Sequence, residues 1–215
     1  MITEKVSEIL GLPIVNEYAT EGPWKMFDDG SAEISVLEFF YALVRLVKPK
    51  EVLETGTYLG LSGSYLGMGL KENGFGHLDS IEWNEDRMEE AKSKWTKLEL
   101  DDFITPHRMS SLEFDTKKQY ELVLLDTEPQ TRFQELKKFW NNIAPGGIIA
   151  IHDLHSDMGT TSGVWHDIDL VEPMIKSHEL TVINFYTPRG FTLCRKANPG
   201  PTRPDYIHSI LKWME

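Results

Sequence analysis

The sequence has little of what marks secreted, membrane-bound or nucleic-acid-binding proteins. Its 215 residues contain one cysteine, Cys194, so an internal disulfide is excluded. The amino terminus lacks a basic segment followed by an apolar run, so we expect no signal peptide and no membrane segment, and we predict a cytoplasmic protein. Basic residues form no long run and the formal net charge is −12, which argues against a partner nucleic acid. Small or neutral ligands are favoured.

Composition and the absence of low-complexity tracts predict one folded unit. Hydrophobic residues make up 40% of the chain, enough to bury a substantial core. We expect a single domain over residues 1–215, with a helical cap at 1–49, a ligand-binding core at 50–196 and a tail at 197–215.

Hydrophobic periodicity and turn residues predict alternating strands and helices. Strands are expected at 51–55, 77–82, 103–107, 120–126 and 148–153, the last preceded by a turn at 145–147. Helices are expected from about 31 to Pro49 and at 62–71, 85–98 and 131–141. Two further β-rich runs, 180–186 and 191–195, should form an antiparallel hairpin. The pattern predicts an α/β fold, a Rossmann-like doubly wound sheet of seven strands, mostly parallel.

The segment 52–62, which reads VLETGTYLGLS, combines a buried strand, an acidic residue and a glycine turn that opens a helix. Gly56 permits a sharp turn and close approach of a ligand to the backbone, and Gly60 permits close helix packing. A dinucleotide fingerprint requires G-x-G-x-x-G, whereas Thr57 stands where its second glycine would be. Glu54 would repel a diphosphate, so the loop favours a cationic ligand.

A second acidic residue ends the next predicted strand. Glu82 is placed to bind both hydroxyls of a ribose, a feature shared by several nucleotide cofactors. Trp83 beside it has two interpretations, the flank of an adenine ring or ordinary packing between strand and helix.

On these motifs the sequence resembles the class I S-adenosylmethionine-dependent methyltransferases, and within them the O-methyltransferases related to the catechol and caffeoyl-CoA enzymes. The resemblance implies that Glu54 and the backbone of 56–60 hold the methionine end of S-adenosylmethionine, and a terminal hairpin agrees with it. The expected cofactor-binding residues are Glu54, Thr55, Gly56, Thr57, Tyr58, Gly60, Ser62, Glu82, Trp83, Ser110, Ser111 and Asp126.

The fifth predicted strand is similar to a methyltransferase group with the motif P-G-G-x-x-x-x-H-D, here residues 145–153. Some members of that group modify glycans or natural products. The resemblance therefore implies a small-molecule acceptor, which is methylated on a hydroxyl oxygen of a small molecule or of a sugar.

Catalysis and metal binding are expected where the fourth and fifth parallel strands end. His152 and His155 are candidate general bases, and Asp153 would orient one of them. In the catechol-type enzymes an Asp and an Asp-Asn pair hold a divalent cation such as Mg²⁺. Asp126 and Asp153 match the two aspartates, but Leu154 replaces the Asn. A metal site at Asp126 and Asp153 therefore stays open.

Other roles are also open. An NAD-dependent oxidoreductase would share the sheet and Glu82, but it would need the glycines of the dinucleotide fingerprint, which this sequence lacks. A third alternative is a non-catalytic protein that binds S-adenosylmethionine. Trp24, Met26 and Phe27 are candidates for an apolar wall around the acceptor or for a subunit interface. Exposed aromatic residues suggest a possible homodimer, and the polar stretch 157–163 has the composition of a substrate lid.

Overall fold

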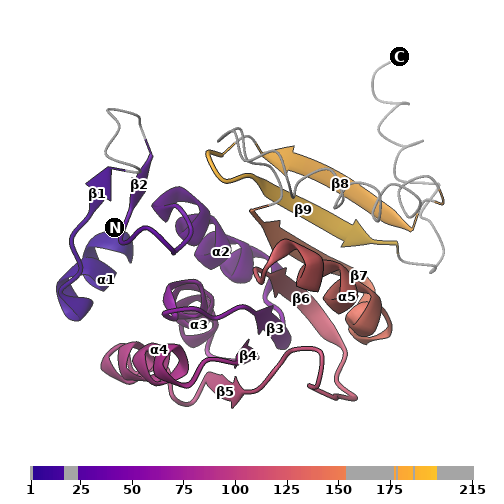
Figure 1. Ribbon diagram of the computed structural model, residues 1–215, viewed down its shortest axis with the longest axis horizontal. Coiled ribbons are helices and arrows are strands. Elements are labelled where there is room, and N and C mark those ends of the chain that lie inside the picture. The colour runs from indigo at the N-terminus through magenta and orange to yellow at the C-terminus, as the bar shows by residue number, and fades with distance from the viewer. Residues whose placement is uncertain (1, 17–23, 154–176, 178, 186, 198–215) are drawn as a thin grey trace.

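The computed structural model describes residues 2–16, 24–153, 177, 179–185 and 187–197. Its centre is a seven-stranded sheet with the order β5-β4-β3-β6-β7-β9-β8 (Figure 1). The strands are β3 (Glu51–Thr55), β4 (His77–Glu82), β5 (Ile104–Arg108), β6 (Tyr120–Leu125), β7 (Ile143–His152), β8 (Leu180–Phe185) and β9 (Phe191–Lys196). Strands β3 to β7 are parallel, and β9 pairs antiparallel with both β7 and β8. The predicted Rossmann-like sheet with a terminal hairpin is confirmed.

Helices precede or connect the parallel strands, as the alternating pattern predicted. They are α1 (Ile2–Leu10), α2 (Ile34–Val47), α3 (Leu61–Asn73), α4 (Glu85–Lys97) and α5 (Pro129–Phe139). Two short strands, β1 (Val15–Asn16) and β2 (Lys25–Met26), pair beside α1. The α3 helix ends at Gly74 in the left-handed conformation, and the Asn84 side chain caps α4 by accepting a hydrogen bond from the Arg87 amide.

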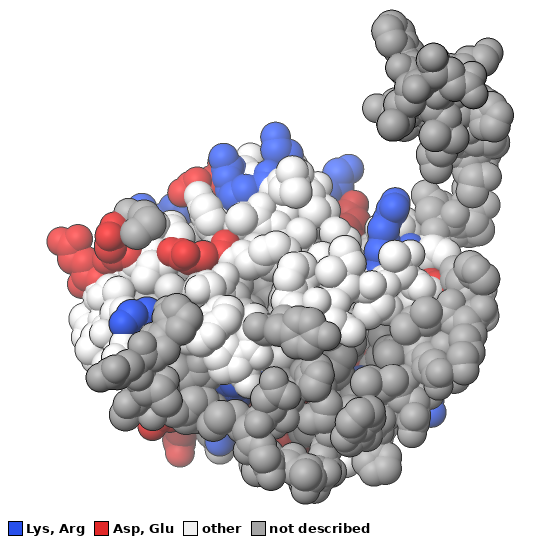
Figure 2. Space-filling view, turned by 90° about the horizontal axis from the view of Figure 1, so that it is seen from above, with Lys and Arg blue, Asp and Glu red and all other residues white. Residues whose placement is uncertain are grey.

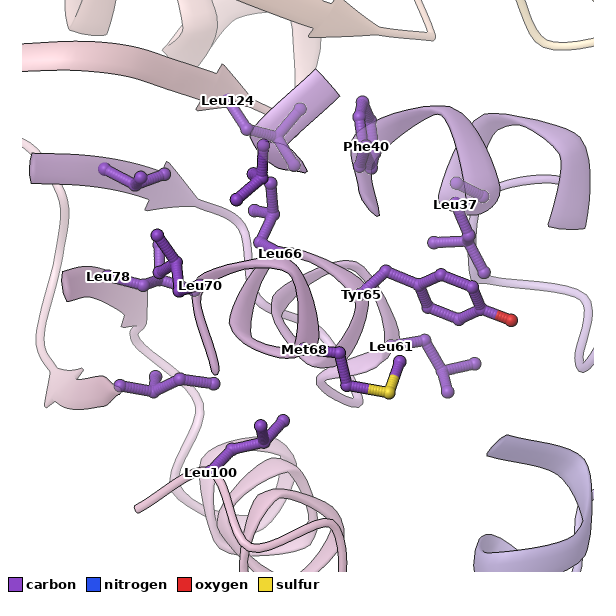
Figure 3. Close-up of a cluster of buried hydrophobic side chains, with 14 of the residues drawn as sticks. Leu37, Phe40, Leu61, Tyr65, Leu66, Met68, Leu70, Leu78, Leu100 and Leu124 are labelled. Carbon is purple, nitrogen blue, oxygen red and sulfur yellow. The ribbon is translucent and has the colours of Figure 1, made fainter. Parts of the chain in front are cut away.

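Apolar side chains on both faces make the sheet the middle layer of three. Alternate residues of a strand point to opposite faces, so Val52 belongs to the buried cluster that includes residues of α2, α3 and α4, while Leu53 belongs to the cluster that includes residues of α5. Figure 3 shows Phe40 of α2, Leu66 of α3 and Leu124 of β6 directed toward one another in the first cluster. The parallel strands are therefore anchored on both sides, which gives their carboxyl ends fixed positions.

The α3 helix is buried along its first ten residues because it is rich in glycine and serine. A Cβ on Gly67 would lie 2.7 Å from Ile104, and one on Gly69 would lie 2.8 Å from Val44. These small residues allow α3 to lie close to β5 and α2. The start of α3, next to the glycine loop, is held by this packing.

Several sequence-based expectations differ from the structure. Residues 145–147 were predicted as a turn before a strand, but they lie inside β7, where Gly146 has φ 78° and the pairing with β6 shifts register. The register shift accommodates the extra residues of β7, so the strand continues through them. Met26 and Phe27 are buried in the core rather than lining a cavity. The stretch 157–163 lies outside the described residues.

The α1 helix was expected only as part of a helical cap. It is attached through Thr3, which donates a hydrogen bond to Glu38 of α2 (2.6 Å) and accepts one from the Tyr65 hydroxyl of α3 (2.9 Å).

Among the described residues, no helix is both long and apolar enough to cross a membrane. The described part of the face in Figure 2 carries both acidic and basic side chains.

Candidate active site

A cavity of about 610 Å³ opens at the carboxyl ends of the parallel strands. Residues that follow four neighbouring strands line it: Gly56 after β3, Glu82 at the end of β4, Asp126 after β6 and Asp153 after β7. Because β3 pairs with both β4 and β6, which connect to opposite faces, the cavity lies at the switch point where open α/β sheets bind ligands. Its volume is in the range of cofactor-sized sites.

Backbone hydrogen bonds hold the loop after β3 to both neighbouring strands. The amides of Gly56 and Thr57 donate to the Ile81 carbonyl (3.0 and 3.2 Å), and the Asp126 amide donates to Thr55 (3.0 Å). Gly56 has φ 82°, and a Cβ there would lie 2.2 Å from the Asp126 carbonyl oxygen. Only glycine fits, so the loop lies directly against the end of β6.

Glu54 lies behind this loop and is fully buried. It accepts hydrogen bonds from Ser80 of β4 and Ser62 of α3, and the Thr57 hydroxyl contacts Ser80 at 2.5 Å. Burial raises the pKa of Glu54 to about 7, and the two serine hydrogen bonds only partly offset this effect. Glu54 therefore supports the loop from beneath and is not part of the cavity wall.

The Glu82 carboxylate is on the cavity wall in a fixed orientation. One oxygen accepts a hydrogen bond from the Tyr58 amide (3.0 Å), and the other accepts one from the Asn84 amide (2.9 Å). Each carboxylate oxygen retains a lone pair, so Glu82 can accept two further hydrogen bonds from a ligand diol. Trp83 also lines the cavity with 68% of its surface exposed, and Arg87 lies 4.9 Å from the centre of the Tyr58 ring.

A buried carboxyl group holds two other segments of the wall. Glu135 of α5 accepts hydrogen bonds from the hydroxyls of Thr55 (3.0 Å), Thr127 (2.7 Å) and Ser111. Burial raises its pKa, and the hydroxyl groups partly counter that rise. Ser111 and Thr127 both line the cavity, so Glu135 positions the loops that follow β5 and β6.

His152 at the end of β7 is 1% exposed and is bound by carboxylates on both ring nitrogens. Its Nε2 lies 2.8 Å from Glu33, and its Nδ1 lies 3.2 Å from Asp126 and 3.4 Å from Asp153. Burial disfavours the charged imidazolium, but the charges of Asp126 and its neighbours outweigh this effect and raise the pKa of His152 to about 10. Burial likewise opposes ionisation of Glu33, yet the hydrogen bond and charge of His152 lower its pKa to about 2.

Two arginines complete the cluster around His152. Arg189, in the turn between β8 and β9, places Nη2 2.9 Å and Nε 2.8 Å from the two carboxylate oxygens of Asp153. Arg132 of α5 donates from Nη1 to the Asp153 carbonyl oxygen (3.1 Å), and its Nη2 lies 3.7 Å from the carboxylate. With His152 protonated, three cations neutralise three carboxylates. We call this set the charge cluster: Glu33, Arg132, Asp126, His152, Asp153 and Arg189.

The structure divides the predicted cofactor residues into two groups. Those on the cavity wall are Gly56, Tyr58, Glu82, Trp83, Ser110, Ser111 and Asp126. Those behind the wall are Glu54, Thr55, Thr57, Gly60 and Ser62. Gly60 is close to α4 rather than to β3, since a Cβ there would lie 2.6 Å from Ala91. The residues of the second group support the loop after β3 from the side that faces away from the cavity.

The predicted catalytic residues are also divided. Asp153 lines the cavity and His152 does not, while His155 lies outside the described residues. A protonated histidine with both nitrogens occupied is not in the state of a general base. The expectation that His152 removes a proton therefore does not fit its surroundings.

Sequence reasoning missed Glu33, Arg132, Glu135 and Arg189. Arg189 lies in the connection between the two runs of the predicted hairpin, and Glu33 lies at the start of a predicted helix, and neither was assigned a role. Both act over long separations: Arg189 contacts Asp153 from 36 residues away, and Glu33 contacts His152 from 119 residues away. Neither contact has a local signal.

Comparison with known proteins agrees with this geometry. Residues 53–154 match a family model described as a methyltransferase domain. That region contains the glycine loop and all four strand ends that line the cavity. No curated protein sequence matches the chain.

Solved structures of methyltransferases share the fold. The O-methyltransferase TomG from Streptomyces achromogenes, in complex with S-adenosylmethionine, has a TM-score of 0.63 and 20% identity, with 80% of this chain and 84% of that chain covered. An O-methyltransferase from Bacillus cereus, in complex with S-adenosylhomocysteine, has a TM-score of 0.68 and 16% identity, with 90% of each chain covered. The Podospora anserina methyltransferase PaMTH1, bound to S-adenosylhomocysteine, has a TM-score of 0.69 and 14% identity, with 92% of this chain and 94% of that chain covered.

Residues 53–154 therefore match a methyltransferase domain, and the chain has the fold of the solved methyltransferase structures. The oxidoreductase alternative is not favoured by these comparisons.

Proposed function

We propose that the protein is an S-adenosylmethionine-dependent methyltransferase that methylates a hydroxyl oxygen of a small molecule or sugar. The observation that carries the proposal is the position of Glu82, a carboxylate fixed by two backbone amides on a cofactor-sized cavity beside the Gly56 loop. The methyltransferase family match over residues 53–154 and the cofactors bound to structures of the same fold support the choice of ligand.

The cavity residues suit the parts of S-adenosylmethionine. Glu82 would accept hydrogen bonds from the ribose hydroxyls, and the exposed Trp83 would cover one face of the adenine. Glu128 is also on the wall and, like Glu82, is outside the charge cluster, and these two carboxylates favour a cationic ligand over a diphosphate. Gly56 allows the ligand to approach the backbone closely.

S-adenosylmethionine, when bound, supplies a methyl group on a positively charged sulfur: a lone pair of the acceptor oxygen forms the O–C bond while the C–S bond breaks and its electron pair stays on sulfur. The chain must align the acceptor with that methyl group and accept the hydroxyl proton. We assign His152 to positioning, because both its nitrogens are held by carboxylates. His155 keeps the role of proposed base, and Asp126 would accept a hydrogen bond from the acceptor hydroxyl.

Isothermal titration with S-adenosylhomocysteine and with NADH tests the cofactor class. We expect micromolar binding of S-adenosylhomocysteine and none of NADH. The Glu82→Gln variant should bind ten- to a hundredfold more weakly, because a hydrogen bond to a charged group contributes about 1.5–3 kcal/mol. The matched control is Glu89→Gln, on the exposed side of α4, where the carboxylate pairs with Lys92. Binding of NADH alone, or of neither compound, would overturn the proposal.

Methyl transfer is tested with methyl-labelled S-adenosylmethionine and a panel of phenolic, sugar and aliphatic hydroxyl acceptors. Label should enter an O-methyl ether in at least one product, and His155→Ala should reduce kcat. Binding without transfer to any acceptor would instead favour a protein that holds the cofactor without catalysis.

A further inference from the structure

The charge cluster includes a group that resembles a divalent metal site. Ligand atoms of Asp126, His152 and Asp153 all lie within 4.8 Å of one another. The resemblance to catechol-type enzymes also implies a cation at Asp126 and Asp153. Whether the group can hold an ion depends on what already occupies those ligand atoms.

Asp153 is occupied by a guanidinium group. Both of its carboxylate oxygens are within 2.9 Å of Arg189 nitrogens, and its main-chain carbonyl oxygen accepts from Arg132. Nη2 donates a hydrogen bond to Oδ2, while Nε lies 2.8 Å from Oδ1, which accepts no hydrogen bond among the described residues. The guanidinium group therefore covers the face of the carboxylate that a metal ion would use. An ion at bonding distance from these oxygens would also lie against a positive charge.

His152 is unsuited to metal binding for a different reason. A histidine ligand must be neutral and must offer a ring nitrogen with a free lone pair. Here Nε2 faces Glu33 and Nδ1 faces Asp126 and Asp153, so both nitrogens act as donors. The group then offers an ion the remaining lone pairs of Asp126 and those of Asp153 Oδ1, which lies against the Arg189 guanidinium, and these do not make a magnesium site.

Hydrogen bonds of its own main chain and side chain hold Arg189 in this position. Its main-chain amide donates to Glu33 (3.0 Å), and Nη1 donates to the Ser31 carbonyl (2.9 Å). The turn that carries it is closed by a hydrogen bond from the Gly190 amide to Thr187 (3.1 Å). The side chain is 18% exposed and lines the cavity.

We propose that Arg189 takes the place of a divalent metal ion, so that this protein binds and methylates its acceptor without one. Arg189 is a positioning residue: it holds Asp153 and supplies, at the cavity wall, a positive charge that the catechol-type enzymes obtain from their ion. The departure at position 154, where Leu replaces Asn, agrees with this assignment. The inference rests on the proposed function for the acceptor's role, but its test reads metal binding directly.

Titration of the chelator-treated full-length chain with Mn²⁺, followed by electron paramagnetic resonance, tests the proposal. We expect the unmodified protein to show only weak binding, unchanged in Asp153→Asn. In Arg189→Gln the Asp153 carboxylate loses the guanidinium group that covers it, so Mn²⁺ affinity should rise at least tenfold. The gain should disappear in the double variant Arg189→Gln/Asp153→Asn. Arg189→Lys keeps the charge and should bind as weakly as the unmodified protein.

The control variant is Arg195→Gln on the neighbouring strand β9, whose exposed side chain is outside the cluster and should give no gain. Micromolar Mn²⁺ binding by the unmodified protein that Asp153→Asn abolishes would overturn the proposal, and so would a folded Arg189→Gln variant that gains no affinity. If Arg189→Gln does not fold, the comparison of the unmodified protein with Asp153→Asn still decides. S-adenosylhomocysteine is titrated into the same samples: its failure to bind would count against the proposed function and leave the metal result intact.

Discussion

Glu33 and His152 form a buried pair, with 2.8 Å between Oε2 and Nε2, although 119 residues separate them in the chain. Glu33 precedes the first residue of α2, and His152 is the last residue of β7. The other Glu33 oxygen accepts from the Arg189 amide in the hairpin turn. One carboxylate therefore joins the start of α2, the end of a central strand and the terminal hairpin at the edge of the cavity.

Replacement of Glu33 by Gln should destabilise the protein strongly. The change removes the carboxylate that binds Nε2 of the buried His152, and breaking a buried pair in this way costs about 3–5 kcal/mol. The free energy of unfolding from urea denaturation, at pH 6, measures the effect. The control Glu113→Gln alters an exposed carboxylate and should stay within about 0.5 kcal/mol of the unmodified protein. A loss below about 1 kcal/mol for Glu33→Gln would show that the pair matters little for stability.

The contributions of Glu33 and His152 should make stability fall on both sides of a range between about pH 4.5 and 6.5, in which both are complete. Glu33 has a folded pKa of about 2, below its ordinary value, so its contribution is present above about pH 4.5 and is lost as the pH falls through 2. His152 has a folded pKa of about 10, so its contribution is complete below about pH 6.5 and is lost as the pH rises through 10. Urea midpoints measured between pH 3 and 10 should follow this profile. An alkaline limb as steep in His152→Asn as in the unmodified protein would contradict the assignment to His152.

Glu54 adds a separate decline between pH 4.5 and 7. Its folded pKa of about 7 lies above the ordinary value, so the folded state retains a proton that the unfolded state releases, and stability falls as pH rises through this range. At pH 8 the unmodified protein must hold a buried carboxylate of which one oxygen, Oε1, has no hydrogen-bond partner among the described residues. Glu54→Gln should therefore be at least as stable as the unmodified protein at pH 8. At pH 5 the stability of the variant relative to the unmodified protein should be lower than it is at pH 8. The difference between the two urea midpoints at these pH values checks the prediction, which fails if the variant loses more stability at pH 8 than at pH 5.

The parallel sheet was predictable because its signals are local. The strands at 51–55 and 77–82 were predicted with the bounds that the structure has, since Gly56 marks the turn after the first and Glu82 ends the second shortly before Asn84, the N-cap of α4. The turn expected at 145–147 was wrong because proline and glycine also occur where a strand shifts its register, and the sequence alone does not distinguish such an irregularity from a turn.

The site was predictable only in part. Residues at strand ends, such as Glu82 and Asp126, were found because topology alone brings strand ends together. Side-chain direction was not predictable: Glu54 also belongs to the end of its strand, yet it points beneath α3 toward Ser62 and Ser80. Arg189 reaches the site from a hairpin whose docking depends on packing across the whole sheet, so no nearby residue indicates its partner.

Glu135→Ala should weaken cofactor binding without touching the cavity directly. The change removes the acceptor for three hydroxyl groups, two of which belong to the wall segments at Ser111 and Thr127. Unsatisfied buried hydroxyls cost about 1–3 kcal/mol, and the released loops should lower S-adenosylhomocysteine affinity about fivefold or more. Gln134→Ala, an exposed neighbour on α5, is the control and should leave affinity unchanged. Equal affinities for the two variants in isothermal titration would show that Glu135 does not position the wall.

Two glycines with similar backbone conformations should respond very differently to alanine. Gly74 has φ 75°, and a Cβ placed there would meet nothing within 4 Å. Gly74→Ala should therefore lower the free energy of unfolding by only about 1–2 kcal/mol, the cost of a left-handed backbone conformation for a residue with a Cβ. Gly56 has φ 82° and its Cβ would lie 2.2 Å from the Asp126 carbonyl oxygen, a backbone atom that cannot move alone. Gly56→Ala should therefore push the loop away from β6, abolish S-adenosylhomocysteine binding and cost more stability than Gly74→Ala. Urea denaturation and isothermal titration of the pair measure both effects. Undiminished ligand affinity in Gly56→Ala would mean that the close contact between this loop and β6 is not needed for the site.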